Sequence, residues 1–319
     1  MTELTEALEY LLSSKTALIS VHVNPDGDAV GAAYAMAACL EMNGIKPLIL
    51  FEGYNGKYDF LEGTEFVYTG GDYDSIRGDI FISLDSASKE RLGEKAQSVF
   101  ERCPRSINID HHISNTYFAH RNIVMAEYSS TCEVIYDIIK QKGLIDGDIA
   151  SALYAGIIYD TGGLMHNCTT ANTLNVVSRL IALNIPFSEI YKNTLCVHSF
   201  AEAKVFGRAL QNFGLSDCGR VAYSFVTFGE LSEFDADKND TDNIANYLLN
   251  TRGAEVSALF VERAAYEIKA SFRSLCLDVN KLAGMFDGGG HMNAAGATIK
   301  GKLKDIMAKV LAEIQARLQ

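Results

Sequence analysis

The stretch "VHVNPDGDAVGAA", residues 21–33, places His22, Asp26 and Asp28 directly after an apolar run. That run, "TALISVHVN", has the composition of a buried strand, and the following "DAVGAAYAMAACLEMNG" predicts a helix that ends at Gly44. A core has no use for two carboxylates and an imidazole at the end of a strand. A Pro-Asp-Gly turn with exposed acids remains an alternative, whereas an EF-hand loop is excluded because the rest of its ligand spacing is missing.

The N-terminal part of the chain alternates strand-like and helix-like patterns. After the first strand and helix come three more apolar runs, "KPLILFEG", "DIFISLDS" and "SINIDHHIS". This alternation predicts an α/β fold, with a mostly parallel sheet and helices on both faces. Such sheets bind ligands outside the carboxyl ends of their strands. We therefore expect the acids of "NPDGD", Asp85 and the "DHH" triplet at 110–112 to meet at one edge, although a lone Asp85 after a strand is also typical of a helix N-cap.

The rest of the chain predicts a second, smaller domain. Helix-like stretches cover 149–159 and 170–184, and the helical pattern of 188–212 is interpreted as a linker. Three β-rich runs follow, "RVAYSFVTF", "EVSALFVER" and "YEIKASFRS", and the chain ends in a helical pattern. We expect a catalytic domain over 1–187 and a smaller α/β domain over 213–319.

Composition excludes several classes of function. The chain has 319 residues, of which 48% are hydrophobic and 21% charged, an ordinary globular profile that is long for a single core. Its formal charge of −12 argues against long duplex nucleic acid as a partner, although local cations can still bind a short anionic substrate.

Seven scattered cysteines without a CxxC pair indicate reduced thiols rather than disulfides or a zinc site. With no signal-peptide pattern and no apolar stretch long enough to span a bilayer, we expect a cytoplasmic protein without membrane contact.

Two further motifs complete a set of metal-ligand types. In "NIDHHIS", neighbouring histidines on an extended strand point to opposite faces, so we expect one to bind a metal while the other faces elsewhere. In "AGIIYDTGG", Asp160 ends an apolar helix, and the amides of Thr-Gly-Gly behind it suit an anion. Four carboxylates and two imidazoles favour two divalent cations, with manganese or magnesium preferred to zinc because no thiolates take part. The candidate ligands are His22, Asp26, Asp28, Asp85, His111 and Asp160.

In this order, "HVNPDGDAVGA", "SLDS", "NIDHH", "GIIYDTGG" and a late "GGGH" resemble the DHH phosphoesterases with a DHH-associated C-terminal domain. Within that family the sequence is most similar to the nanoRNase (oligoribonuclease) and pAp-phosphatase branch, over nearly the whole chain. The resemblance implies that Asp85 bridges two metals, that His112 contacts the scissile phosphate, and that Asp110 orients an imidazole from behind the ligands. It further implies two ligand sets: His22, Asp26 and Asp85 for the first metal, and Asp28, Asp85, His111 and Asp160 for the second.

The late glycine-rich motif is the candidate substrate loop. Arg273 ends a predicted strand, and His291 follows Gly288, Gly289 and Gly290, so a cation and an imidazole stand beside open backbone amides that suit a terminal phosphate. The alternative for the three glycines is a tight turn before the last strand.

Three more residues bear on the same loop. Arg252 is a weaker candidate for substrate binding, with a solvated helix-end charge as its alternative. Family members often have "GGGGHRNAAG" where this chain has "DGGGHMNAAG". Asp287 therefore adds a negative charge and Met292 removes a positive one, which is expected to weaken the affinity for highly charged ligands such as pAp.

The predicted function is a manganese-dependent phosphodiesterase, with magnesium or cobalt as other possible ions. It would degrade RNA of two to five nucleotides to 5′-mononucleotides and convert pAp to AMP, as a monomer or homodimer. One alternative is a phosphodiesterase of linear or cyclic dinucleotides (pApA, pGpG, c-di-AMP), of which the linear ones fit a chain without sensor segments. A pyrophosphatase or exopolyphosphatase should carry more basic residues near Asp287, and an inactive nucleotide-binding module should have lost ligands.

Overall fold

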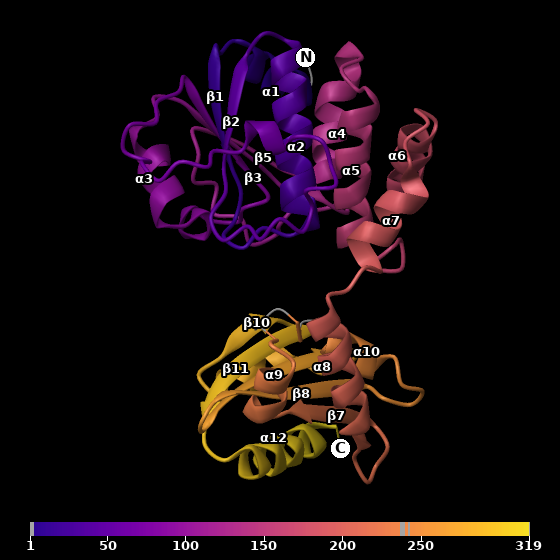
Figure 1. Ribbon diagram of the computed structural model, residues 1–319. Helices are drawn as coiled ribbons and strands as arrows, with labels where there is room; N and C mark the ends of the chain where they lie inside the picture. Colours follow the sequence, from indigo (N-terminus) through magenta and orange to yellow (C-terminus); the bar gives the residue numbers. More distant parts are fainter. Residues whose placement is uncertain (1–2, 237–239, 242, 319) are drawn as a thin grey trace. The chain divides into compact units, whose positions relative to one another are not determined.

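The computed structural model describes residues 3–236, 240–241 and 243–318 (Figure 1). The chain divides between Val197 and His198 into two compact units. Each unit is built around its own sheet, and the predicted α/β class is confirmed. None of the described helices combines the length and the apolar character needed to cross a bilayer.

The N-terminal unit contains a five-stranded sheet in the order β2-β1-β3-β4-β5. Every neighbouring pair is parallel, so the carboxyl ends of all five strands lie along one edge. The strands are β1 (Thr16–Ser20), β2 (Lys46–Leu50), β3 (Ile80–Leu84), β4 (Ser106–Asp110) and β5 (Arg121–Val124).

Helices cover both faces of this sheet, as predicted. One face packs against α1 (Glu3–Leu12), α2 (Gly27–Met42) and α4 (Thr131–Ile139), and the other against α3 (Glu94–Arg102) (Figure 1). The helix α5 (Gly147–Asp160) packs on α2 and α4. Outside α5 lie α6 (Ala171–Ile181) and α7 (Phe187–Leu195). Short 3₁₀ turns occupy Thr64–Phe66, Lys89–Leu92 and Lys140–Lys142.

The pair α2 and α5 lies at the centre of this unit and is apolar on nearly all sides, as expected for a helix without a solvent face. Close approach of the two helices requires glycine. A Cβ on Gly31 would lie 2.4 Å from the carbonyl oxygen of Ala152, and one on Gly156 would lie 2.8 Å from Asp28 Oδ1. The contact at Gly156 places α5 directly against the first turn of α2, which carries Asp28.

The helical pattern of 188–212 forms two helices instead of one. The first is α7, and the second is α8 (Phe200–Gln211), with non-helical backbone at 197–199. The reason is local: the Ser199 hydroxyl accepts a hydrogen bond from the Glu202 N–H and so begins a new helix. Val205 and Ala209 of α8 are buried in the core of the C-terminal unit.

The C-terminal unit contains a mixed six-stranded sheet in the order β10-β11-β9-β8-β7-β6, in which only β7 and β8 are parallel. The helices α8, α9 (Phe228–Glu233) and α10 (Ile244–Leu249) cover one face, while α11 (Val279–Gly284) and α12 (Leu303–Arg317) cover the other. Its strands are β6 (Gly214–Leu215), β7 (Val221–Val226), β8 (Val256–Ala264), β9 (Glu267–Ser274), β10 (Gly289–His291) and β11 (Ala294–Lys300).

Candidate metal centre

Asp85 lies at the centre of the polar cluster at the carboxyl edge of the parallel sheet. It follows β3, and its backbone is left-handed (φ 52°), a conformation that costs energy for any residue with a Cβ. The Asp85 N–H donates to the carbonyl of Ile109 at 3.0 Å, which ties this turn to β4. The side chain is 3% exposed. Strained backbone at a buried carboxylate is typical of a functional site.

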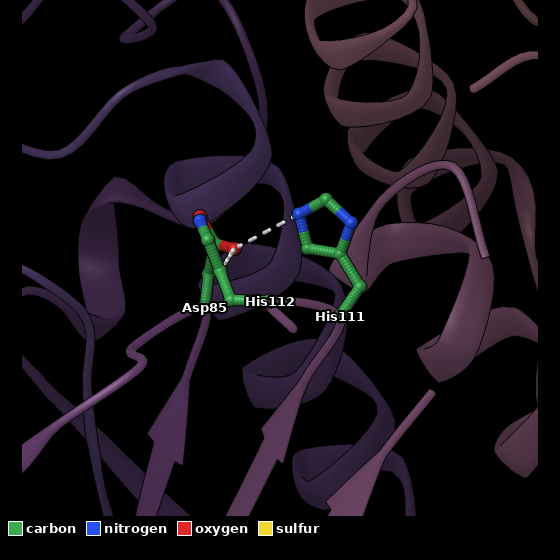
Figure 2. Close-up of side chains that lie close together, drawn as sticks. All are labelled: Asp85, His111 and His112. Carbon is green, nitrogen blue, oxygen red and sulfur yellow. Dashed lines mark ion pairs between the residues drawn. The ribbon is translucent and has the colours of Figure 1, made fainter. Parts of the chain in front are cut away.

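The two carboxylate oxygens of Asp85 face different groups of donors. Oδ2 lies 3.6 Å from His22 Nε2, which in turn lies 3.7 Å from Asp26 Oδ2. Oδ1 lies 3.7 Å from His111 Nε2 and 3.6 Å from His112 Nδ1 (Figure 2). One carboxylate thus joins two clusters, His22–Asp26–Asp85 and Asp85–His111–His112.

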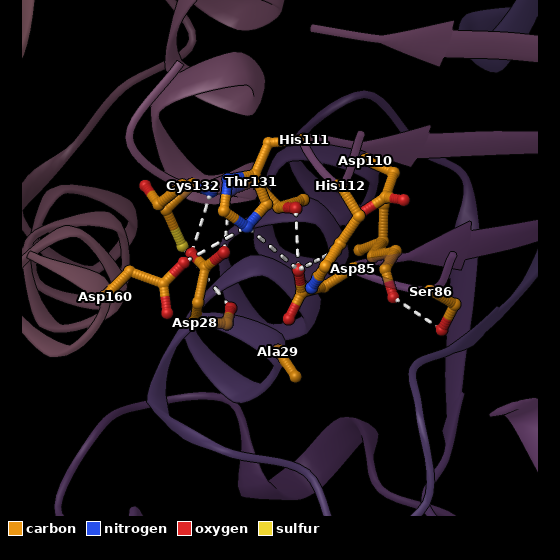
Figure 3. Close-up of polar contacts among 12 residues, drawn as sticks. Asp28, Ala29, Asp85, Ser86, Asp110, His111, His112, Thr131, Cys132 and Asp160 are labelled. Atoms are coloured by element: carbon orange, nitrogen blue, oxygen red, sulfur yellow. Dashed lines mark hydrogen bonds and ion pairs between the residues drawn. The ribbon is translucent and has the colours of Figure 1, made fainter. Parts of the chain in front are cut away.

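A third group of donors joins helices to the sheet edge. Asp28 at the start of α2 and Asp160 at the end of α5 face His111 (Figure 3). His111 Nε2 lies 3.2 Å from Asp160 Oδ2. Within each of the three groups the donor atoms lie within 4.8 Å of one another. The structure therefore brings together all six ligands expected from the sequence.

The expectation that the two histidines diverge is wrong. The chain leaves β4 at Asp110, so strand alternation does not extend to His111 and His112, and their ring centroids lie only 4.7 Å apart. Both rings reach Asp85, but they differ in their second contact. His112 Nδ1 lies 2.7 Å from Asp110 Oδ1, whereas the contact of His111 is with Asp160.

Asp110 lies behind the cluster and is fully buried. While Oδ1 contacts His112, Oδ2 accepts a hydrogen bond of 2.6 Å from the Asn115 amide. Asn115 also donates to Asn108 Oδ1 at 2.7 Å. A carboxylate held in this way fixes the orientation of the imidazole it contacts. Sequence reasoning missed Asn115, because an asparagine three residues after "DHH" carries no motif signal.

Sequence reasoning also missed the first turn of α4. The main-chain N–H groups of Thr131 and Cys132 donate to the two oxygens of Asp28 at 2.7 and 2.9 Å, and the Thr131 hydroxyl donates to Asp85 Oδ1 at 3.0 Å. Asp26 is bound locally instead, because its Oδ1 accepts from the N–H groups of Asp28 and Ala29 and so caps α2. Its other oxygen remains directed to His22.

The cluster shifts the pKa values of its imidazoles upward. Burial lowers the pKa of His22, but the carboxylates of Asp26 and Asp85 outweigh it and raise the pKa to about 10. Burial likewise opposes the shift of His111, whose pKa rises to about 10 beside Asp160, Asp28 and Asp85. The His112 pKa is raised for the same reason, chiefly by Asp110. Positive charge is therefore favoured at all three positions.

The carboxylates show that negative charge is in excess. Burial raises the pKa of Asp160 to about 6, and it raises that of Asp28, with the charges of Asp160 and Asp85 adding to the effect. Asp85 is the exception, since its three histidine neighbours overcome burial and lower its pKa to about 2. Buried oxygen and imidazole donors with surplus negative charge fit divalent cations well. Burial and Asp28 hold the pKa of the Cys132 thiol well above its usual range, so this group offers no thiolate.

The loop after α5 packs around Asp160. Gly162 and Gly163 are left-handed (φ 55° and 72°), and His166 Nδ1 lies 2.9 Å from the Asp160 carbonyl oxygen. The positive φ of Gly162 would strain any residue with a Cβ, so this turn favours glycine. The sequence motifs had assigned no role to His166.

The predicted substrate residues lie in the C-terminal unit. Arg273 on β9 pairs with Ala294 on β11, which pairs with His291 on β10, so the two side chains share one face of the sheet. The Arg273 guanidinium also donates to Asn246 Oδ1 at 2.7 Å. Arg252 is exposed in the turn after α10.

The glycine-rich motif forms part of a hairpin, with Gly289 and Gly290 in β10. Gly288 and Gly290 lie against β11, where a Cβ would come within 2.3 Å of the Gly296 oxygen and 2.5 Å of the Ala294 oxygen respectively. Close packing therefore explains two of the three glycines, while Gly289 is exposed.

Comparison with known proteins identifies two domains in this chain. The DHH family, N-terminal domain, matches residues 16–157, and the DHHA1 domain matches residues 219–318. The chain thus carries a DHH domain followed by a DHHA1 domain. The family predicted from the ordered motifs is thereby confirmed. This DHH protein is 29% identical over 306 residues to a Bacillus subtilis (strain 168) protein named bifunctional oligoribonuclease and PAP phosphatase NrnA, covering 92% of this chain and 93% of that one.

Solved structures show the same fold. An exopolyphosphatase-related protein from Bacteroides fragilis superposes with a TM-score of 0.88 at 24% identity, over 98% of this chain and 97% of that one. RecJ from Thermus thermophilus, solved in complex with Mn²⁺, gives a TM-score of 0.54 at 12% identity, over 98% of this chain and 54% of that one. At sequence identities of 24% and 12%, these two matches show a shared fold.

Proposed function

We propose that this DHH protein is a phosphodiesterase that works with two divalent cations, manganese being favoured. His22, Asp26 and Asp85 would hold one ion, and Asp85 would share in holding the second. The remaining ligands of the second ion would be Asp28, His111 and Asp160. The observation that carries this proposal is the Asp85 carboxylate, whose two oxygens face two donor clusters. Bound ions of this kind activate water and neutralise charge on a phosphoryl group.

The chain's own residues complete the reaction site. His112 is held through Nδ1 by Asp110, which leaves Nε2 to contact the substrate. The contact with Asp110 raises the pKa of His112, and a protonated ring can donate from Nε2 to a phosphate oxygen. Asp110 keeps that ring in place and is fully buried itself. We assign phosphate contact to His112 and ring orientation to Asp110.

The proposed substrates are RNA of a few nucleotides, cut to 5′-mononucleotides, and pAp. The name of the B. subtilis relative, oligoribonuclease and PAP phosphatase, supports this class. The formal charge of −12 disfavours long duplexes, which require extended basic surfaces. In the C-terminal unit, Arg273 and His291 on one sheet face offer donors for a phosphate of the substrate, with Gly289 exposed beside them. Arg252 is proposed only as an outlying contact.

An assay with defined substrates tests the proposal. The protein is incubated with manganese and, separately, with RNA of two to five nucleotides, RNA of roughly two dozen nucleotides, pAp, c-di-AMP or pyrophosphate. We expect release of mononucleotides from the short RNAs and of AMP from pAp, with loss of activity on chelation. Asp85→Asn is the inactive control. Hydrolysis confined to pyrophosphate or c-di-AMP would replace the proposed substrate class.

A further inference from the structure

We infer that Thr131 is a positioning residue of the metal centre, an inference that rests on the proposed function. Its hydroxyl donates to Asp85 Oδ1 at 3.0 Å. In the described part of the chain this is the one hydrogen bond within 3.5 Å that the Asp85 carboxylate accepts, since its histidine contacts are 3.6 Å or longer. Thr131 therefore controls how the carboxylate is turned.

Rotation of that carboxylate matters because each oxygen serves a different cluster. If Asp85 turned about its Cβ–Cγ bond, Oδ2 would leave His22 and Oδ1 would leave His111 together. The terminal carboxylate torsion has a broad and weak intrinsic preference. A hydrogen bond from a fixed donor supplies the restraint that the torsion itself lacks. Thr131 is fully buried, so no solvent molecule from the bulk replaces its hydroxyl.

The donor is itself held from several sides. The main-chain N–H of Thr131 is bound to Asp28 Oδ2 at 2.7 Å, so one residue contacts ligands of both proposed ions. Glu133, two residues further along α4 and 1% exposed, accepts hydrogen bonds from Ser129, Asn172 and Thr173. These bonds fix the start of α4 against α6. The first turn of α4 is therefore rigid before any ion binds.

The experiment compares Thr131→Val, which keeps the shape and removes the hydroxyl, with Thr131→Ser, which keeps the hydroxyl. The matched control is Thr194→Val in α7, where a buried hydroxyl has no hydrogen-bond partner among the described residues. Calorimetric titration with MnCl₂ gives the number of bound ions and their affinity, and kcat is measured at saturating manganese. The thermal midpoint of each metal-free variant reports any general loss of stability.

We expect Thr131→Val to weaken manganese binding by about 10- to 100-fold, the range for removing a group that orients a metal ligand. Thr131→Ser should restore most of the affinity, and Thr194→Val should bind as the unaltered protein does. Equal affinity in Thr131→Val, or failure of Thr131→Ser to recover, would overturn the inference. If Thr131→Val does not fold, Thr131→Ala provides the same comparison. An unaltered protein that binds no manganese would instead overturn the proposed function.

Discussion

The Asp85 carboxylate is shared between two donor clusters, and this distinguishes it from the other candidate carboxylate ligands of the sequence. A neutral amide at this position cannot hold two cations at the separation of about 3.5–4 Å used by two-metal sites. We therefore expect Asp85→Asn to lose more activity than Asp26→Asn, by at least ten-fold in kcat/KM. The measurement is hydrolysis of a dinucleotide at saturating manganese. Asp26→Asn also loses part of the cap on α2, so both variants are checked by circular dichroism.

Comparable losses from the two variants would contradict a bridging role for Asp85. So would a preparation of Asp85→Asn that binds two manganese ions with unchanged affinity. The second result would show that both ions have complete ligand sets without the shared carboxylate.

His111 and His112 are neighbours in sequence but differ in the groups that hold them. His111 Nε2 lies against Asp160, among the proposed ligands, whereas His112 Nδ1 is bound to Asp110 behind the site. We expect His111→Ala to lose one bound manganese ion, and His112→Ala to keep both while its turnover falls. Elemental analysis of the purified variants, with a dinucleotide assay beside it, measures both quantities. The reverse pattern would exchange the two assignments.

The tripeptide Asp-Gly-Asp occurs twice and shows what sequence can say at the residue scale. Asp26 and Asp146 both cap helices through the same pair of backbone N–H groups. Yet Asp28 is fully buried among ligands, and Asp148 is exposed. The tripeptide alone predicts the start of a helix. What distinguished the first copy was the histidine before it and the other motifs at later strand ends.

Gly156 links the packing of α2 and α5 to the candidate metal centre. A Cβ there would lie 2.3 Å from Cys132 Sγ and 2.8 Å from Asp28 Oδ1. Overpacking of this kind costs about 1–3 kcal/mol, so we expect Gly156→Ala to lower the thermal midpoint and to weaken manganese binding. Gly147→Ala is the matched control, because Gly147 is in the same helix and nothing lies within 4 Å of its Cβ position.

The control should be neutral or slightly stabilising, since alanine restricts the unfolded chain. Gly31→Ala separates the two effects of Gly156→Ala, because its Cβ would meet a backbone carbonyl rather than a ligand. It should lose stability while its manganese affinity stays close to normal. If all three variants were equally stable, the close approach of α2 and α5 would not be required.

At the scale of elements, hydrophobic periodicity predicted four of the five parallel strands and the helices α2, α5 and α6, whereas β5, α3 and α4 were not predicted. The contacts at the start of α4 were not predictable, because they depend on where two distant segments meet. Thr131 and Asp85 are far apart in the sequence, and a threonine before an apolar helix usually indicates a cap. The break between α7 and α8 was missed for a different reason: the polar cap at Ser199 interrupts a continuous helical pattern without a proline or glycine.

For the whole molecule, the raised pKa values predict how stability depends on pH without metal. His22 and His111 have folded-state pKa values of about 10 against 6.5 in the unfolded chain, so their contribution is complete below the lower value and is lost as pH rises toward the higher. The pKa values of Asp28 and Asp160 are also raised, so their contribution to stability is likewise lost as pH rises, but in a lower pH range. We expect the metal-free thermal midpoint to fall between about pH 6 and pH 9.

Manganese should reverse this trend. Ion binding requires deprotonated ligands, so affinity and the stabilisation it brings rise with pH. Differential scanning calorimetry with chelator and with excess MnCl₂ measures both series. His22→Gln is the control, because it removes one raised pKa and should flatten the metal-free curve. A metal-free midpoint that rises over this window would show that the imidazoles are not held in their charged form.

We expect Arg273 and His291 to act in substrate recognition and not in hydrolysis of the phosphodiester itself. The proposed metal centre would need only a phosphodiester, so hydrolysis of bis-p-nitrophenyl phosphate should change little in Arg273→Ala and His291→Ala. A dinucleotide offers a second phosphate, and binding it positions the scissile bond, so both kcat and KM should suffer. We expect a loss of about 1–3 kcal/mol in kcat/KM for pApA, the range for removing a charge-assisted hydrogen bond.

Arg317→Ala is the control for general electrostatics, because it removes one positive charge from the same unit at an exposed pair with Glu313. Met292→Arg restores the basic residue usual in the family and should help pAp more than a substrate with a neutral end, since the added charge meets a second phosphate. The decisive comparison is between the two substrates of Arg273→Ala. If this variant slows the small diester as much as pApA, the arginine supports the fold or the metal centre, because a residue that only recognises the far phosphate cannot affect a substrate that lacks one.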